Sequence, residues 1–429
     1  MVYSYSNYSQ IFLDIMKIIA LNFNARRTSM KYKILASILL TLSLLLSSCG
    51  SSGSSGGTGT APGGSIEPFS LAEKEFVHHL FLTEYLWYEQ VASNIDYSNF
   101  STPQLLVDGL KVLPPDQWSF SVTAQQYEDA ANQKTIGFGF GYNSDFNIFV
   151  VRIGAPAYGK LFRGDKILEV NGEAVSDSLI ANASQAVNVS TTFTVLRGTD
   201  QVDVVVVPRE YTFKVTLGNI INNHGIKVGY LRYDEFTGSS VNEFEQEFTK
   251  FKAAGISELV IDLRYNGGGA VEVASILLDN LSNVHAGERQ VYLDWNANFQ
   301  NKNSAYYFSD DVEANDLNMK RVVFLVTRSS ASASELLISA LKPYLGETKV
   351  VTIGDATHGK PVGMSGRSYG SNYYFLINFL VRNNAGETTS FNGIPATCAA
   401  EDDITHIMGD IEETMLKTAL HYIDTGSCL

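Results

Sequence analysis

The sequence has few cysteines, a shortage of basic residues and no metal-binding pattern, and each shortage excludes a class of function. Only three of its 429 residues are cysteine, and no cluster of histidine and cysteine has zinc-site spacing. Lysine and arginine number 31 against 45 acidic residues, for a formal net charge of −14. Because no basic stripe is available to contact phosphates, this composition disfavours nucleic acid as a partner. The 45% of hydrophobic residues provide for a core, and the length suggests two or three domains.

The apolar run Ile34–Leu46 is too short to be a membrane-spanning helix with its own flanks. It follows Lys31 and Lys33, and a Leu-Ser-Ser-Cys-Gly pattern ending in Cys49-Gly50 comes next. This arrangement resembles a bacterial lipoprotein signal, in which Cys49 becomes the lipidated first residue. The alternative is an uncleaved signal anchor. The resemblance implies a protein held in the cell envelope by a lipid anchor and facing the periplasm.

The residues on either side of this signal refine the expectation. Met30 stands directly before the basic pair, so we expect the natural start at Met30 and no role in the fold for residues 1–29. Residues 50–64 are almost entirely Ser, Gly and Thr, which predicts a flexible tether. Gly50 is not the Asp that often signals inner-membrane retention, which favours the outer membrane.

Cys398 and Cys428 are the two cysteines that remain in the exported part of the chain. An oxidising compartment favours one disulfide between them, which would staple the tail, residues 402–427, to the body. The alternative is a pair of free thiols.

Residues 70–94 and 102–113 have the apolar spacing of two helices, and Pro114-Pro115 ends the second. From residue 226 onward strands and helices alternate, which predicts a layered α/β core. The expected strands are 226–231, 259–263, 322–326 and 350–353, with further strands over 373–383, and the expected helices are 241–254, 270–281 and one that starts at residue 332.

Residues 135–209 contain short strands and glycine turns instead. The loop Gly137-Phe138-Gly139-Phe140, followed downstream by Arg163-Gly-Asp-Lys-Ile-Leu-Glu-Val-Asn-Gly172, resembles a PDZ domain. Glycines in such a loop let successive backbone N–H groups converge on a carboxylate, and the adjacent strand edge can receive an extended peptide. The alternative is a small β domain that serves only for packing.

Three motifs in the α/β part carry a more specific resemblance. They are Asp-Leu-Arg-Tyr-Asn-Gly-Gly-Gly (262–269), Ser-Ser-Ala-Ser-Ala-Ser-Glu (329–335) and Thr-Ile-Gly-Asp-Ala-Thr-His-Gly-Lys (352–360). Together they resemble the carboxyl-terminal processing, or tail-specific, serine proteases over about residues 70–400. The resemblance implies a Ser–Lys dyad, with Ser332 as nucleophile and Lys360 as general base, and no metal or cofactor.

The residues themselves are compatible with these roles. Ser332 lies where a buried strand turns into a helix, and such a turn exposes a side chain beside free N–H groups. A lysine can act as a base only when burial or a cationic neighbour lowers its pKa, and Lys360 lies in a short apolar stretch. Ser332 and Glu335 also form an S-x-x-E capping box, so Ser332 could be only a helix cap. Ser330 and Ser334 are rival nucleophiles.

The oxyanion donors would be the N–H groups of Ala333 and of one glycine in 267–269, for which we select Gly268. His358, oriented by Asp355, is the alternative base. One departure from the family is Met364, because many members carry a glutamine four residues after the lysine, and methionine cannot orient an amine.

The expected fold is therefore an α/β core of layered sheet and helices, ClpP/crotonase-like, with an inserted PDZ-like β domain and a small helical N-terminal domain. The expected function is an exported serine endopeptidase that captures polypeptide C-termini. The rivals are an inactive peptide-binding lipoprotein and a structural adaptor of the envelope. The expected boundaries are 1–48 for the extension and signal, 49–67 for the tether, 68–133 for the N-terminal domain, 134–210 for the PDZ-like domain, 211–400 for the core and 401–429 for a helical tail.

Overall fold

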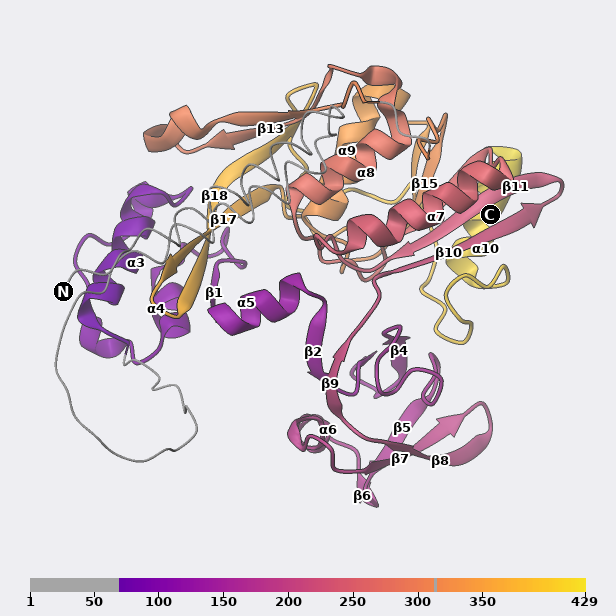
Figure 1. The fold of residues 1–429 in the computed structure, drawn as a ribbon, viewed down its shortest axis with the longest axis horizontal. Coiled ribbons are helices and arrows are strands. Elements are labelled where there is room, and N and C mark those ends of the chain that lie inside the picture. Colours follow the sequence, from indigo (N-terminus) through magenta and orange to yellow (C-terminus); the bar gives the residue numbers. More distant parts are fainter. Residues whose placement is uncertain (1–68, 312–314) are drawn as a thin grey trace, which may run out of the picture. The chain divides into compact units, whose positions relative to one another are not determined.

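The computed structural model describes residues 69–311 and 315–429 (Figure 1). They belong to a compact unit that spans Glu67–Leu429. The predicted lipoprotein signal, Cys49 and the tether lie outside the described residues. Within the two described ranges, none of the helices is both long enough and apolar enough to cross a bilayer.

A six-stranded sheet forms the centre of the fold. Its strand order is β10-β11-β12-β15-β16-β19, with β11 to β19 parallel and β10 antiparallel to β11. The parallel pairing follows from the alternation of strands and helices, because parallel neighbours need a crossover. The bounds are β10 (Thr216–Asn223), β11 (Ile226–Tyr233), α7 (Ser240–Ala254), β12 (Glu258–Asp262), α8 (Val271–Ser282), β15 (Val322–Val326), α9 (Ala333–Leu345), β16 (Val350–Gly354), β19 (Cys398–Ala399) and α10 (Thr414–Thr425).

Helices cover both faces of this sheet, which explains why its inner strands are apolar along their whole length. Every residue of β15 and β16 is buried. Val260 and Val323 pack on one face against Met415 and other side chains of α10. On the opposite face, a side chain at Gly229 would contact Phe251 of α7.

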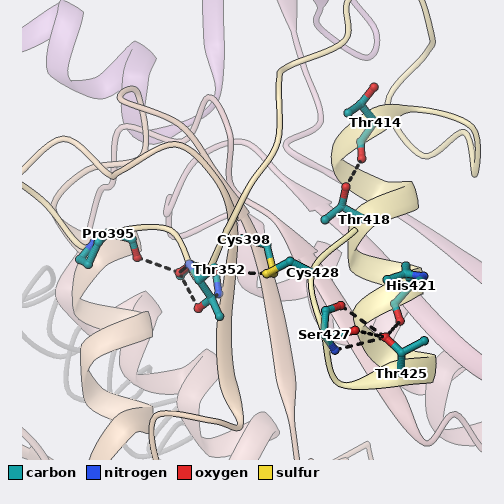
Figure 2. The surroundings of a disulfide bond; sticks show 10 residues. Thr352, Pro395, Cys398, Thr414, Thr418, His421, Thr425, Ser427 and Cys428 are labelled. Atoms are coloured by element: carbon teal, nitrogen blue, oxygen red, sulfur yellow. Dashed lines mark hydrogen bonds between the residues drawn. A yellow bond between two sulfur atoms is a disulfide. The ribbon is translucent and has the colours of Figure 1, made fainter.

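A disulfide links Cys398 in β19 to Cys428, just after the end of α10 (Figure 2). The two Cα atoms are 5.4 Å apart, within the range that a disulfide requires. The predicted pairing of the two cysteines is confirmed. The bond fastens the C-terminal helix to the edge strand of the central sheet.

A second sheet and the N-terminal helices form another layer. Strand β18 is its centre and pairs antiparallel with β1, β13 and β17, while β14 pairs with β13. Helices α3 and α4 pack on β17 and β18 through a buried apolar cluster. The bounds are α3 (Leu71–Thr83), η1 (Tyr88–Gln90), η2 (Tyr97–Asn99), α4 (Pro103–Leu110), β1 (Phe120–Thr123), α5 (Ala124–Ala131), η3 (Asn283–His285), β13 (Arg289–Trp295), η4 (Ala297–Lys302), β14 (Ser304–Tyr307), β17 (Val362–Tyr369) and β18 (Asn372–Asn383).

The β-rich segment, residues 134–212, has its own small core around Ile167, Phe193 and Val195. It contains a four-stranded sheet in the order β6-β5-β7-β8 and the pairs β2–β9 and β3–β4. The bounds are β2 (Lys134–Gly137), β3 (Phe140–Tyr142), β4 (Ile148–Val151), β5 (Lys166–Val170), β6 (Glu173–Ala174), α6 (Asp177–Gln185), β7 (Thr191–Arg197), β8 (Asp200–Val206) and β9 (Arg209–Thr212).

Two helices are shorter than the sequence predicts. The helix expected over 70–94 ends at Thr83, because the following residues make tertiary contacts instead. Leu86 N–H donates to the Ile377 carbonyl at 2.8 Å, which ties the chain to β18. The tail expected to be helical over 401–429 is helical only over Thr414–Thr425. In the first helix, the helical spacing of apolar residues continues in the sequence beyond Thr83, but this long-range hydrogen bond turns the backbone out of the helix.

Candidate active site

The turn that follows β15 carries three candidate serines, and their surroundings separate them. Ser330 and Ser334 are fully buried. Their hydroxyls donate to the carbonyl oxygens of Leu263 at 2.8 Å and Asn266 at 2.9 Å. These two serines therefore fasten the turn to the loop after β12. Ser332, between them, lines an open pocket.

The backbone of Ser332 adopts a conformation that is rare for residues with a side chain. Its φ is 57° and its ψ is −113°, and it is the N-cap residue of α9. Such a conformation costs on the order of 1–3 kcal/mol and persists only where the surroundings enforce it. A strained strand-to-helix turn of this kind exposes the nucleophile in α/β-hydrolases, and a helix N-terminus favours a negative charge beside it.

The carboxylate of Glu335 joins this turn to the loop that carries Lys360. Glu335 is 1% exposed, and its Oε2 accepts hydrogen bonds from the N–H groups of Ser332 (2.9 Å) and Lys360 (2.8 Å). Its Oε1 accepts from the N–H of Gly359 (2.7 Å) and the hydroxyl of Thr357 (2.6 Å). The capping-box pattern predicted the bond within the turn. It carried no signal for the three bonds to the second loop, whose residues lie more than 20 positions away.

Lys360 is half-buried, and its pKa is lowered from 10.5 to about 8. Burial is the largest cause, because it disfavours the ammonium form. The carboxylates of Asp116 and Glu335 act in the opposite direction and raise the pKa. The Lys360 ammonium lies 5.8 Å from the centre of the Trp118 ring. Its side chain forms no hydrogen bond or ion pair with another residue in the described part of the chain.

Ser332 and Lys360 line the same pocket. Apolar side chains from α8, α9, β17 and β18 supply much of the remaining wall, among them Val271, Leu336, Val362 and Val381. A pocket with this lining suits an apolar group. In residues 69–311 and 315–429, no group of three or more His, Cys, Asp or Glu side chains could hold a metal ion.

The glycine loop after β12 packs tightly against the Ser332 turn. Gly268 has a φ of 109°, and a Cβ at this position would lie 2.8 Å from the Ser332 Cβ and 3.0 Å from the Ala333 nitrogen. Any larger residue would therefore displace the turn. The close approach explains why glycine is required here.

The N–H groups near Ser332 differ in availability. The N–H of Gly268 donates to Asn266 Oδ1 at 2.8 Å. The N–H groups of Gly269 and Ala333 have no hydrogen-bond partner among the residues that the structure describes. An N–H without a partner at a helix N-terminus can receive a developing oxyanion.

Both ring nitrogens of His358 have partners other than Ser332. Its Nε2 accepts a hydrogen bond from the Trp118 indole N–H at 3.2 Å, and its Nδ1 lies 3.1 Å from the Arg328 carbonyl oxygen. An Nε2 acceptor implies a neutral ring with its proton on Nδ1. Asp355 pairs with Arg328 at 3.5 Å. The alternative Ser–His–Asp arrangement is therefore not assembled.

Met364 lies in β17 and packs against the apolar cluster beneath α3 and α4. Its side chain therefore supports the packing of the N-terminal helices on the second sheet. It supplies no polar group to orient the Lys360 amine.

A cluster of charges behind the glycine loop was not predicted from the sequence. Arg264 is fully buried. Its guanidinium donates two hydrogen bonds of 2.9 Å to Glu413 and one of 2.7 Å to Asp402. Arg163 of the β-rich segment donates to the same Asp402 carboxylate at 2.6 Å, and the Tyr265 hydroxyl also donates to it. Asp402 thus links the β-rich segment to the loop after β12. Sequence separations above 130 residues left no local pattern to reveal this.

The glycine loop of the β-rich segment lies between two strands, with Gly137 at the end of β2 and Phe140 at the start of β3. The Phe138 side chain is buried in the core of the segment. The N–H groups of Phe138 and Gly139 have no partner among the described residues. They remain available to a ligand.

Comparison with known proteins places this geometry in a family. Residues 227–397 match the model described as "Peptidase family S41", and residues 72–120 match "Peptidase S41 N-terminal domain". The "Probable CtpA-like serine protease" of Staphylococcus aureus (strain bovine RF122 / ET3-1) is 27% identical over 297 residues, or 64% of this chain and 56% of that protein. The "Carboxyl-terminal-processing protease" of Picosynechococcus is 28% identical over 162 residues, or 35% of each chain. The chain thus spans about half the length of the Staphylococcus relative.

Solved structures show the same fold. A crystal structure assigned to the S41 proteases, from Bacteroides fragilis, superposes with a TM-score of 0.71 and 22% identity, covering 82% of this chain and 97% of the other. The photosystem II D1 C-terminal processing protease gives a TM-score of 0.50 and 18% identity, covering 81% and 97%. The matched models span both the N-terminal helices and the sheet that carries Ser332 and Lys360. Residues 72–120 and 227–397, which include Ser332 and Lys360, belong to peptidase family S41.

Proposed function

We propose that the protein is a serine endopeptidase in which Ser332 is the nucleophile and Lys360 is the general base. The observation that carries the proposal is the convergence of both side chains on one pocket, with the pKa of Lys360 lowered to about 8. At that pKa roughly half of the amine is neutral near pH 8 and can accept a proton. The Glu335 carboxylate supports the proposal because it binds the backbones of both residues.

In the proposed mechanism, the neutral Lys360 amine takes the proton of the Ser332 hydroxyl as its oxygen attacks the peptide carbonyl carbon. The carbonyl oxygen becomes an oxyanion, which the N–H of Ala333 and an N–H of the loop Gly267–Gly269 stabilise. The Lys360 ammonium then protonates the leaving amine as the C–N bond breaks. Water hydrolyses the acyl-enzyme, with the same amine as base.

The oxyanion partner of Ala333 has two candidates in this loop. Gly268 lies closest to the turn, but its N–H is bonded to Asn266, whereas the N–H of Gly269 is available. A small rotation of the Gly268 peptide would release its N–H from Asn266, so that this N–H rather than that of Gly269 would face the oxyanion. The Lys360 amine and Ser332 hydroxyl are not hydrogen-bonded here, and catalytic hydrogen bonds often tighten only when substrate binds.

We propose that the β-rich segment is a PDZ-like domain that captures a polypeptide C-terminus. Its support is the pair of available N–H groups at Phe138 and Gly139, next to the edge of β3. A carboxylate bound there would leave the preceding residues to pair with β3 as an added strand. Arg163 of this segment donates a hydrogen bond to Asp402, which also binds Arg264 of the loop after β12. A movement of the segment would therefore be transmitted to the loop beside Ser332.

We also propose that the protein is exported and lipidated at Cys49, which would hold it at the periplasmic face of the envelope, with the outer membrane favoured. The support is the basic, apolar and Ser-Ser-Cys sequence of residues 31–49. Metabolic labelling with a fatty acid analogue tests this directly. Incorporation in the wild type and none in Cys49→Ala is expected, and equal incorporation in both would contradict it.

Digestion of an unfolded protein such as casein, and of peptides with apolar or charged C-termini, tests the peptidase. Cleavage by the wild type and none by Ser332→Ala or Lys360→Ala is expected. Ser334→Ala is a matched control for the serine, because its hydroxyl only fastens the turn.

A second candidate is a peptide-binding envelope protein without cleavage activity. The placement of Met364 among apolar side chains favours it, since no polar group holds the Lys360 amine from that position. Absence of any cleavage by the wild type, together with retention of peptides with free C-termini, would replace the peptidase by this candidate.

A further inference from the structure

An aromatic surface borders the candidate active site, and the proposed chemistry does not use it. Its two members are Trp118, in the connector between α4 and β1, and Phe391, in the loop after β18, and we call this pair the aromatic platform. The two rings are stacked, with centroids 6.3 Å apart and an angle of 24° between their planes. Phe391 is 49% exposed. Because single exposed apolar residues are common on protein surfaces, only the position of this one can indicate a role.

The aromatic platform is continuous with the pocket that Ser332 and Lys360 line. The Trp118 ring centre lies 5.8 Å from the Lys360 amine nitrogen, so the Phe391 ring centre lies within about 12 Å of that nitrogen. Thr389, two residues before Phe391, lines the pocket itself. The loop after β18 therefore passes from the wall of the pocket to an aromatic ring that is open to solvent.

Both parts of the platform are fastened to the loop that follows β16. Close to Phe391, the Ile394 N–H donates to the Thr357 hydroxyl at 2.7 Å, and the Thr357 N–H donates to the Ile394 carbonyl oxygen at 3.0 Å. The indole N–H of Trp118 donates to His358 of the same loop at 3.2 Å. A surface that is already fixed loses little conformational freedom when it binds a ligand, so these contacts favour binding.

We propose that the aromatic platform is a substrate subsite, which binds a large apolar side chain, preferably an aromatic one, of the polypeptide being cleaved. The inference rests on the proposed function, since it concerns the substrate of that site. A side chain placed on the exposed Phe391 ring would lose water-accessible apolar surface, and aromatic rings attract each other in stacked or edge-to-face contacts. An extended chain advances about 3.3 Å per residue, so this side chain would belong to a residue within about four positions of the scissile bond.

A series of peptides tests the subsite. Each peptide carries the same apolar residue for the pocket and a single phenylalanine, which is moved one position at a time along the four residues on each side of the scissile bond. The measured quantity is the ratio of kcat/KM for each phenylalanine peptide to kcat/KM for the peptide with alanine at that position. In the wild type this ratio is expected to reach about tenfold at one or two positions, and in Phe391→Ala it is expected to fall below about threefold there.

Two further variants serve as controls. Tyr307→Ala is the matched control, because Tyr307 is 52% exposed in β14 and is not one of the residues that line the pocket. It is expected to keep the wild-type ratios. Phe391→Tyr keeps the ring and is expected to keep the preference for phenylalanine. Since Phe391 is half exposed, all three variants are expected to fold, which thermal unfolding checks.

Measurements of binding separate this inference from the proposed function. Ser332→Ala cannot cleave by the proposed mechanism, so its dissociation constants for the same peptides, labelled with a fluorophore, report on the subsite alone. Suppose that the wild type cuts nothing, while Ser332→Ala binds one phenylalanine peptide about tenfold more tightly than its alanine counterpart and loses this preference when Phe391→Ala is added. The peptidase would then be refuted and the subsite retained.

Two results would overturn the inference. The first is no preference for phenylalanine at any position, or a preference that Phe391→Ala leaves unchanged. The second is a change in the sedimentation of Phe391→Ala together with unchanged ratios, because the aromatic platform would then contact a second copy of the chain instead of the substrate.

Discussion

Glu335→Gln offers a sharp test of how the site is held together. The buried carboxylate accepts four hydrogen bonds, from three backbone N–H groups and the Thr357 hydroxyl. Glutamine has the same shape but only one acceptor oxygen. We expect its amide nitrogen at the Oε1 position, because the Thr357 hydroxyl can rotate to accept while the Gly359 N–H cannot.

The magnitude follows from the bonds lost. A hydrogen bond to a charged group contributes about 1.5–3 kcal/mol, so loss of the bond from the Gly359 N–H is expected to reduce stability by about that amount. With an unfolding entropy of about 2.1 cal/mol/K per residue over the unit Glu67–Leu429, this corresponds to a fall in Tm of about 2–4 °C. Loosening of the loop that carries Lys360 is expected to lower kcat/KM by about a hundredfold, as for misplacement of a catalytic group by about 1 Å.

The assay combines thermal unfolding, followed by circular dichroism, with peptide cleavage. Glu347→Gln is the matched control, because that side chain is 72% exposed and only pairs with Lys342 at 2.9 Å. Its change in stability is expected within about 0.5 kcal/mol. If Glu335→Gln melts and cleaves like this control, the carboxylate does not hold the two loops together.

Three further predictions follow from the site and the disulfide. The kcat/KM is expected to rise with pH and level off above about 8, because Lys360 acts as the neutral amine and its pKa is lowered to about 8; a profile that is flat from pH 6 to pH 10 would contradict this base. Gly268→Ala is expected to abolish cleavage while the protein still folds, since its Cβ would lie 2.8 Å from the Ser332 Cβ; unchanged kcat/KM would show that the turn tolerates displacement. Replacing Cys398 and Cys428 by serine removes a cross-link of sequence separation 30, and urea unfolding is expected to show a loss of about 3–4 kcal/mol; equal midpoints with and without the bond would refute this.

Local sequence patterns predicted the elements that depend on neighbouring residues. The unbroken apolar run Val322–Val326 became β15 with the predicted bounds, because a strand covered by helices on both faces needs apolar residues throughout. The two C-terminal cysteines were paired correctly, because they are the two cysteines that follow Cys49 in the sequence and have one possible bond between them. The glycine triplet predicted a close backbone approach, and a Cβ at Gly268 would indeed clash with the Ser332 turn.

Other features were decided only by contacts between residues far apart in the chain. Serines at 330, 332 and 334 look equivalent in sequence, and burial by the neighbouring loop distinguishes them. Glu335 was visible as a helix cap, but its bonds to residues 357–360 require the parallel pairing of β15 and β16. Trp118 has no local pattern that indicates a role, and only the tertiary structure brings its ring to 5.8 Å from the Lys360 ammonium.

The sequence by itself therefore determined the four inner strands of the central sheet, β11, β12, β15 and β16, together with the glycine loops, the disulfide and the short list of chemical groups. Their accessibility, hydrogen-bond partners and basicity depend on burial and on fixed charges, which arise only when distant segments pack. The lowered pKa of Lys360 is the clearest case, because both its burial and its two opposing carboxylates come from the tertiary structure.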